Sequence, residues 1–280
     1  FQRMPTLREL GRDLADDFPE LRRYNWDVEL ALTYLYHHHP WQTEPSALRE
    51  RARFFDLQER VAQRVRETED TLGQSQPAEW VSALMRHWHE TRATVITLNW
   101  DTLVERAAFR ATGVKHAAHL WPVPLVLLQG RLYGLLAGTA PQTFQLLKLH
   151  GSTNWLYSGH GQFAGDQVYY VWDHTTGEPT WDDEVKLLAR DKVPLIIPPV
   201  ADKSGFYAHD AVRTIWSLAA AALRNASAVY CLGYSMPWTD LTVRYLLSNS
   251  FPPDQVPLYV VNMVADEEEL VALIDRYRTV

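Results

Sequence analysis

The chain has 280 residues, a hydrophobic fraction of 46%, a charged fraction of 22% and a formal net charge of −7, which is ordinary for a globular protein with a sizeable core. The negative charge argues against direct nucleic-acid binding, and the single cysteine, Cys231, excludes a disulfide framework and a four-cysteine zinc site. No apolar run reaches membrane-spanning length, and the first residues lack the apolar core of a signal peptide. We therefore expect a cytoplasmic protein with no membrane partner.

The first third of the chain predicts helices. One begins after Thr6, with Leu7, Leu10 and Leu14 on one face, and others are predicted at 27–36, 44–71 and 79–91. The segment 44–71 is so rich in charge that we expect a long solvent-facing helix, with an assembly surface as the alternative. Residues 20–92 are expected to form a helical module.

From Thr94 onward, short apolar or β-branched runs alternate with helical segments. Strands are predicted at 94–98, 144–149, 194–197, 228–232 and 258–261, helices at 102–111, 209–225, 238–248 and 266–277, and hairpins at 123–136 and 162–171. This alternation indicates an α/β fold whose core, residues 94–280, is a Rossmann-like doubly wound parallel sheet. The N-terminal helices would form an added layer or insertion within one domain, 1–280.

Polar side chains follow three of these predicted strands. The three runs are Thr97-Leu98-Asn99-Trp100-Asp101, Lys148-Leu149-His150-Gly151 and Cys231-Leu232-Gly233-Tyr234-Ser235. Because parallel strands end at the same edge of a sheet, we expect one ligand crevice there. Each run alone is more often structural, as a satisfied histidine, a helix cap or a turn. Their occurrence together favours a binding site.

These runs, followed by Val261-Asn262, resemble in order the signature motifs of the sirtuin family. The chain is similar to the divergent bacterial branch of sirtuin-like NAD-consuming domains, over about its last two thirds. The resemblance implies an NAD glycohydrolase, which converts NAD⁺ and water to ADP-ribose and nicotinamide. It also implies a role as an NAD-depleting effector of antiphage defence. Such effectors act as homo-oligomers or with a partner such as an ATPase or an Argonaute-type protein.

Cleavage of the nicotinamide–ribose bond builds positive charge on the ribose, and it is assisted by a positioned water and a base. His150 titrates in the range that suits this base, and the Asn99 amide can both donate to and accept from the water and a ribose hydroxyl. The resemblance implies that Asp101 orients the nicotinamide. It further implies that NAD is bound by Thr97, Gly151, Gly233, Tyr234, Ser235 and Asn262.

The chain departs from the family in two respects. The zinc-binding cysteines of protein-deacylating sirtuins are absent, so we expect no zinc, and a protein deacylase is the less favoured alternative. We do not interpret His116 and His119 as metal ligands, and we expect them at the surface. The Gly-rich loop that holds the pyrophosphate is also absent, and we expect it, with the first strand, upstream of Phe1. Without that loop, the alternative is a catalytically silent nucleotide-binding, sensing or scaffold domain.

Overall fold

The structure is a computed structural model that describes residues 4–130, 142–158, 167–198, 205, 207, 209–238, 240–252 and 256–279. The chain divides into two compact units, Phe1–Ile215 and Trp216–Val280, called here the first and the second unit. The expected helical module, residues 20–92, lies within the first unit. In the described part of the chain, no helix combines the length and the apolar character needed to cross a bilayer.

The first unit begins with α1 (Leu7–Asp13), α2 (Glu20–Arg23), α3 (Val28–Tyr36), α4 (Glu44–Gly73) and α5 (Glu79–Thr91). Helix α1 starts at a capping box, in which the Thr6 side chain accepts the N–H of Glu9 and the Glu9 carboxylate accepts the N–H of Thr6. The first four helices enclose a buried apolar cluster, which contains Leu10, Leu14, Phe18, Leu21, Val28, Ala31, Leu32, Leu35, Phe54, Leu57, Val61 and Val65. All four predicted helices of this region are therefore confirmed.

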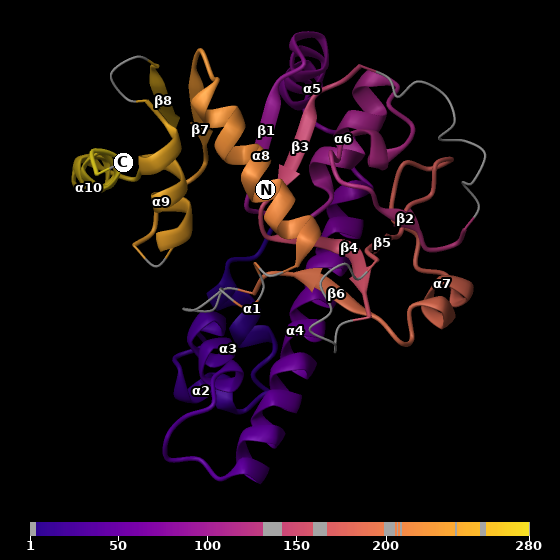
Figure 1. The fold of residues 1–280 in the computed structure, drawn as a ribbon, viewed down its shortest axis with the longest axis vertical. Helices are drawn as coiled ribbons and strands as arrows, with labels where there is room; N and C mark the ends of the chain where they lie inside the picture. The colour runs from indigo at the N-terminus through magenta and orange to yellow at the C-terminus, as the bar shows by residue number, and fades with distance from the viewer. Residues whose placement is uncertain are drawn as a thin grey trace. The chain divides into compact units, whose positions relative to one another are not determined.

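Two short parallel strands, β1 (Thr94–Thr97) and β3 (Gln145–Lys148), form one sheet of the first unit (Figure 1). Their register pairs Thr94 with Gln145 and Thr97 with Lys148. Helix α6 (Leu103–Thr112) follows β1, as predicted. The short 3₁₀ helix η1 (Ala117–His119) comes next along the chain.

A second sheet of the first unit contains β2 (Val126–Leu127), β5 (Tyr169–Tyr170), β4 (Gly151–Tyr157) and β6 (Val193–Ile196), in that spatial order. Strand β5 is parallel to β2 and antiparallel to β4, and β4 is antiparallel to β6. Among the described residues the partner of β2 is β5, and the second strand of the hairpin predicted at 123–136 lies outside them. The turn predicted within 162–171 also lies outside them. Helix α7 (Asp183–Leu188) precedes β6 and was not predicted.

Strand β4 is the main element that the sequence did not predict. Its first half carries Ser152, Thr153 and Asn154, which lack the apolar pattern of a buried strand, yet all three are fully buried. Hydrogen bonds to distant residues replace the lost contacts with water. The neighbouring Trp155 is also fully buried and packs edge-on against Trp121, with ring centres 5.2 Å apart.

Helix α4 is not the solvent-facing helix that its charge predicted. In steps of four residues it buries Leu57, Val61, Val65, Glu69 and Gly73, and this spacing keeps the five positions on one face of the helix. Leu57, Val61 and Val65 on this face belong to the apolar cluster shared with α1, α2 and α3, and the helix also packs against β4 and β6. The other faces of the helix are rich in charged residues, so the overall composition of the segment does not reveal the buried positions.

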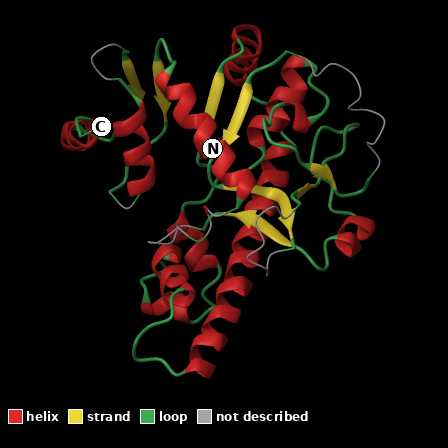
Figure 2. Cartoon of the chain, in the orientation of Figure 1, coloured by secondary structure: helices red, strands yellow, loops and turns green. Residues whose placement is uncertain are grey.

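The second unit contains a third sheet, the parallel pair β7 (Val229–Leu232) and β8 (Leu258–Val261), with α9 (Leu241–Ser250) and α10 (Glu267–Tyr277). Helix α8 (Asp210–Arg224) spans the boundary between the units. The α/β class is confirmed, because the described chain contains both helices and strands, which Figure 2 shows in red and yellow. The described strands form three sheets, two of them parallel pairs, rather than one continuous sheet.

Candidate functional site

The parallel pairing of β1 with β3 brings together two of the polar runs. Thr97 is the register partner of Lys148, and the carbonyl of Thr97 accepts the N–H of Leu149 at 3.0 Å. The segments that carry Asn99 and His150 therefore leave the sheet at the same edge. This edge is the part of the first unit where the sequence predicted the reaction site.

Asn99 and Asp101 differ in their surroundings. Asn99 is exposed, and its backbone N–H donates to the Thr97 hydroxyl at 3.2 Å. Asp101 is 9% exposed, and its carboxylate accepts the N–H of Leu103 at 3.1 Å, in the first turn of α6. Asp101 thus has a structural role at the helix start, while the Asn99 side chain lies where a ligand can reach it.

Leu149 and His150 form the connection between β3 and β4, and Gly151 begins β4. His150 is 8% exposed, and its carbonyl accepts the N–H of Ile197 at 2.8 Å. Gly151 has φ +76°, and a Cβ at this position would lie 2.0 Å from the carbonyl oxygen of Leu195. The close approach of the chain at Leu195 therefore requires glycine here, independently of any ligand.

A buried carboxylate, Glu69 of α4, lies beneath the segment that follows β1. Its two oxygens accept the N–H and the hydroxyl of Thr102, each at 3.0 Å, and the hydroxyl of Thr153, also at 3.0 Å. The guanidinium of Arg106 lies 3.6 Å away. Burial, followed by the nearby charge of Asp101, raises the pKa of Glu69 to about 7.

A second buried charge, Lys148 of β3, reaches the same segment. Its ammonium donates to the backbone carbonyl of Asp101 and pairs with Glu105 of α6 at 3.1 Å. The side chains of Lys148 and Glu105 are 1% and 0% exposed. The sequence analysis quoted Lys148 as part of its run and assigned it no role, and it missed Glu69. The signal that would have found Glu69 is a carboxylate in an otherwise apolar stripe of α4.

In the second unit, the pairing of β7 with β8 brings together the two remaining runs. Leu232 is the register partner of Val261, and the N–H of Gly233 donates to the Val261 carbonyl at 2.8 Å. Gly233 has φ +69°, and no atom lies within 4 Å of the position of a Cβ. Gly233 thus combines a backbone conformation that favours glycine with open space. Ser235, two residues further on, is exposed.

Tyr234 and Asn262 also lie together in this unit. The Tyr234 carbonyl accepts hydrogen bonds from the Tyr277 hydroxyl at 2.7 Å and from the Asn262 amide at 3.4 Å. The Tyr234 hydroxyl donates to Asp240 at 3.2 Å, and burial with this carboxylate raises the pKa of Tyr234. The phenol therefore keeps the proton that it donates to Asp240 even above the ordinary pKa of 10.0.

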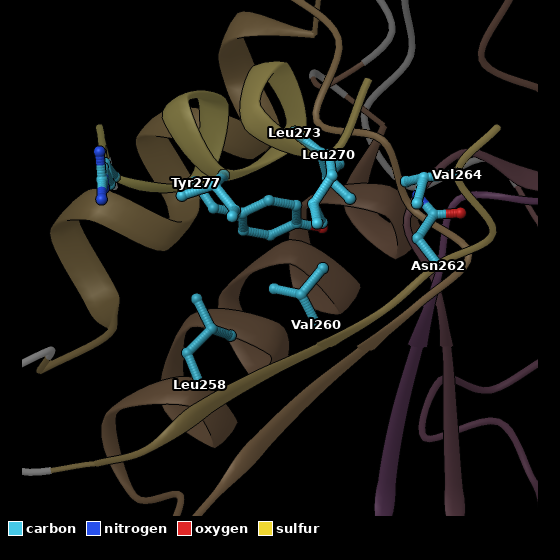
Figure 3. A pocket seen from close by; sticks show the side chains of 9 residues that line it. Leu258, Val260, Asn262, Val264, Leu270, Leu273 and Tyr277 are labelled. Atoms are coloured by element: carbon cyan, nitrogen blue, oxygen red, sulfur yellow. The ribbon is translucent and has the colours of Figure 1, made fainter. Parts of the chain in front are cut away.

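Asn262 lines a pocket of about 340 Å³ between β8 and α10. Figure 3 shows Leu258 and Val260 projecting from β8, with Leu270, Leu273 and Tyr277 projecting from α10 on the opposite side. The walls are mostly apolar, and Asn262 supplies an amide that can donate and accept. The pocket could hold a flat apolar group with a polar edge.

His116 and His119 are half-buried rather than at the surface as expected, because the His116 ring packs against both His119 and His174. The Nδ1 atoms of His116 and His174 are 2.8 Å apart, so one ring donates a hydrogen bond and the other accepts it. Burial lowers the pKa of all three rings. Within the part of the chain that the structure describes, no group of three His, Cys, Asp or Glu side chains is arranged to hold a metal ion.

The comparisons with known proteins add no identification. No protein-family model matches the chain, and a search of curated proteins returned no significant match.

Proposed function

We propose that the chain is an NAD glycohydrolase that releases nicotinamide from NAD⁺. The observation that carries this proposal is the parallel pairing of β1 with β3, which puts Asn99 and His150 at one sheet edge. An amide and an imidazole are the side chains that orient a water and accept its proton. We include in the proposal the finer fold assignment, a sirtuin-like Rossmann fold.

The proposed reaction consumes one water and yields ADP-ribose, nicotinamide and a proton. As the nicotinamide–ribose bond breaks, the exposed Asn99 amide holds the water and a ribose hydroxyl. His150, which is 8% exposed, accepts the proton that the water loses. The Asp101 carboxylate accepts the Leu103 N–H, and its backbone carbonyl accepts the Lys148 ammonium. We therefore propose that Asp101 acts on the reaction site through its negative charge and through the position of its backbone.

The second unit supports the binding half of the proposal. Gly233 leaves open space where a backbone N–H can approach a phosphate, and the exposed hydroxyl of Ser235 can donate to it. Asn262, with the pocket beside it, suits the adenosine end. We include activation by self-assembly or by a defence partner, since the resemblance implies one of these.

The test is the release of nicotinamide from NAD⁺, measured by chromatography on the chain together with any residues that precede Phe1 in its reading frame. Asn99→Ala and His150→Ala should each lower kcat roughly 100-fold or more. The matched controls are His87→Ala on α5 and Asn225→Ala after α8, both at exposed positions, and both should keep full activity. Ser235→Ala and Asn262→Ala should mainly raise KM.

Three other outcomes would refute the proposal. Unchanged release by His150→Ala would remove the assigned base. Binding of ADP-ribose without any cleavage, in the presence of candidate activators, would favour a nucleotide-sensing domain. Turnover of an acyl-lysine peptide would favour a deacylase.

A further inference from the structure

We propose that Glu69 of α4 and Lys148 of β3 are positioning residues, which hold the backbone of 100–102 from beneath and thereby set the position of Asn99. The catalytic role of these two residues rests on the proposed function. Their hydrogen bonds to the backbone of 101–102 are independent of it. Neither side chain touches the reacting atoms. Both act through the segment that follows β1.

Glu69 holds the C-terminal end of this segment. Its carboxylate accepts the N–H of Thr102, which would otherwise be one of the unpaired donors at the start of α6. The same carboxylate binds the hydroxyls of Thr102 and Thr153, so it joins α4, α6 and β4 at one point. Glu69 is 1% exposed, so these hydrogen bonds are shielded from water.

The backbone carbonyls of the segment are held from the β3–β4 side. The Trp100 carbonyl accepts the N–H of Thr153 at 2.9 Å and the hydroxyl of Ser152 at 3.2 Å. The next carbonyl, that of Asp101, accepts the ammonium of Lys148. Asn99 thus stands next to a segment whose polar backbone atoms are bound on consecutive residues, although Asn99 itself is exposed.

The charges around Glu69 make this hold dependent on protonation. Arg106 of α6 and Lys148 of β3 favour the ionised carboxylate, whereas Asp101 and burial oppose it. Both cations also have other partners: Arg106 pairs with Asp70 and Glu178, and Lys148 pairs with Glu105. An ionised carboxylate accepts stronger hydrogen bonds than a neutral carboxyl. The Thr102 N–H should therefore be held more tightly above pH 7 than below it.

The experiment measures hydrogen exchange of the Thr102 amide by NMR, as protection factors at pH 6 and pH 8, in the 280-residue chain. In the parent, protection should rise roughly tenfold between the two pH values, as for a hydrogen bond that gains a charged acceptor. Glu69→Gln, which mimics the neutral carboxyl, should show low protection at both. Glu67→Gln, an exposed position on the same helix, is the control and should behave as the parent.

Equal protection in Glu69→Gln and the parent would overturn the proposal. If Glu69→Gln does not fold, Thr153→Val should give a smaller loss of Thr102 protection, which Thr153→Ser restores; no loss in Thr153→Val also overturns it. If nicotinamide release is found, Glu69→Gln should lower kcat and flatten its pH profile around pH 7, with KM within about twofold. Hydrogen exchange is measured without substrate. It therefore tests how Glu69 holds the Thr102 backbone even if the chain does not cleave NAD⁺.

Discussion

Replacement of Lys148 by methionine tests the buried ion pair that joins β3 to α6. The Lys148 ammonium lies 3.1 Å from the Glu105 carboxylate, and the two side chains are 1% and 0% exposed. At this distance an effective dielectric constant of about 20 gives an attraction of about 5 kcal/mol. The other carboxylate oxygen of Glu105 has no hydrogen-bond partner among the described residues. Lys148→Met therefore leaves a buried, uncompensated charge, and we expect it to lower the free energy of unfolding by about 3–5 kcal/mol.

The double variant Lys148→Met, Glu105→Leu separates the charge from the packing. It removes both charges and leaves mainly the Asp101 carbonyl without its donor, at a cost of about 1–3 kcal/mol. The double variant should therefore be more stable than Lys148→Met alone. Unfolding in urea at pH 7, followed by far-ultraviolet circular dichroism, gives the free energies of unfolding of the parent, the two single variants Lys148→Met and Glu105→Leu, and the double variant. Single substitutions that each cost less than about 1 kcal/mol, or costs that simply add, would refute the reasoning.

Three further changes have defined outcomes. In Gly151→Ala, the residue has φ +76° and its new Cβ would lie 2.0 Å from the Leu195 carbonyl oxygen, so the urea midpoint should fall strongly. The control is Gly233→Ala, where φ is +69° but the space is open, and the free energy of unfolding should fall by only about 1–2 kcal/mol. The lowered pKa values of His116, His119 and His174 mean that the unfolded chain binds more protons, so stability should be full above the ordinary pKa of 6.5 and fall as pH drops below it. Urea midpoints from pH 7.5 to 5.5 would show this fall, and His174→Gln should reduce it; a pH-independent midpoint contradicts the assignment. Asp27→Ala removes the acceptor of the Leu30 N–H at the start of α3 and should cost about 1 kcal/mol, whereas an unchanged thermal midpoint would show that the cap contributes nothing.

The sequence predicted those elements whose identity depends on local pattern. Capping residues and apolar periodicity located α1, α3, α5 and α6, and β-branched or apolar runs located β1, β3, β7 and β8. Because these strands form parallel pairs, the residues that follow them lie together within each unit, Asn99 with His150 and Gly233 with Asn262. The order of strands and polar residues therefore predicted which of these residues lie near one another within each unit.

Tertiary structure decided where polar groups are buried. Glu69 and Thr153 are 84 residues apart in the chain, and each is buried because the other satisfies it. The polar run at the start of β4 has no local pattern of a buried strand, so β4 was not predicted. The expectation that α4 faces solvent rested on its charged composition and not on the spacing of its apolar residues. The glycine at 151 has the same origin, since the carbonyl that excludes a Cβ belongs to Leu195. Sequence periodicity reports which residues share a face, whereas the partner that allows a charge to be buried is set by the packing of distant segments.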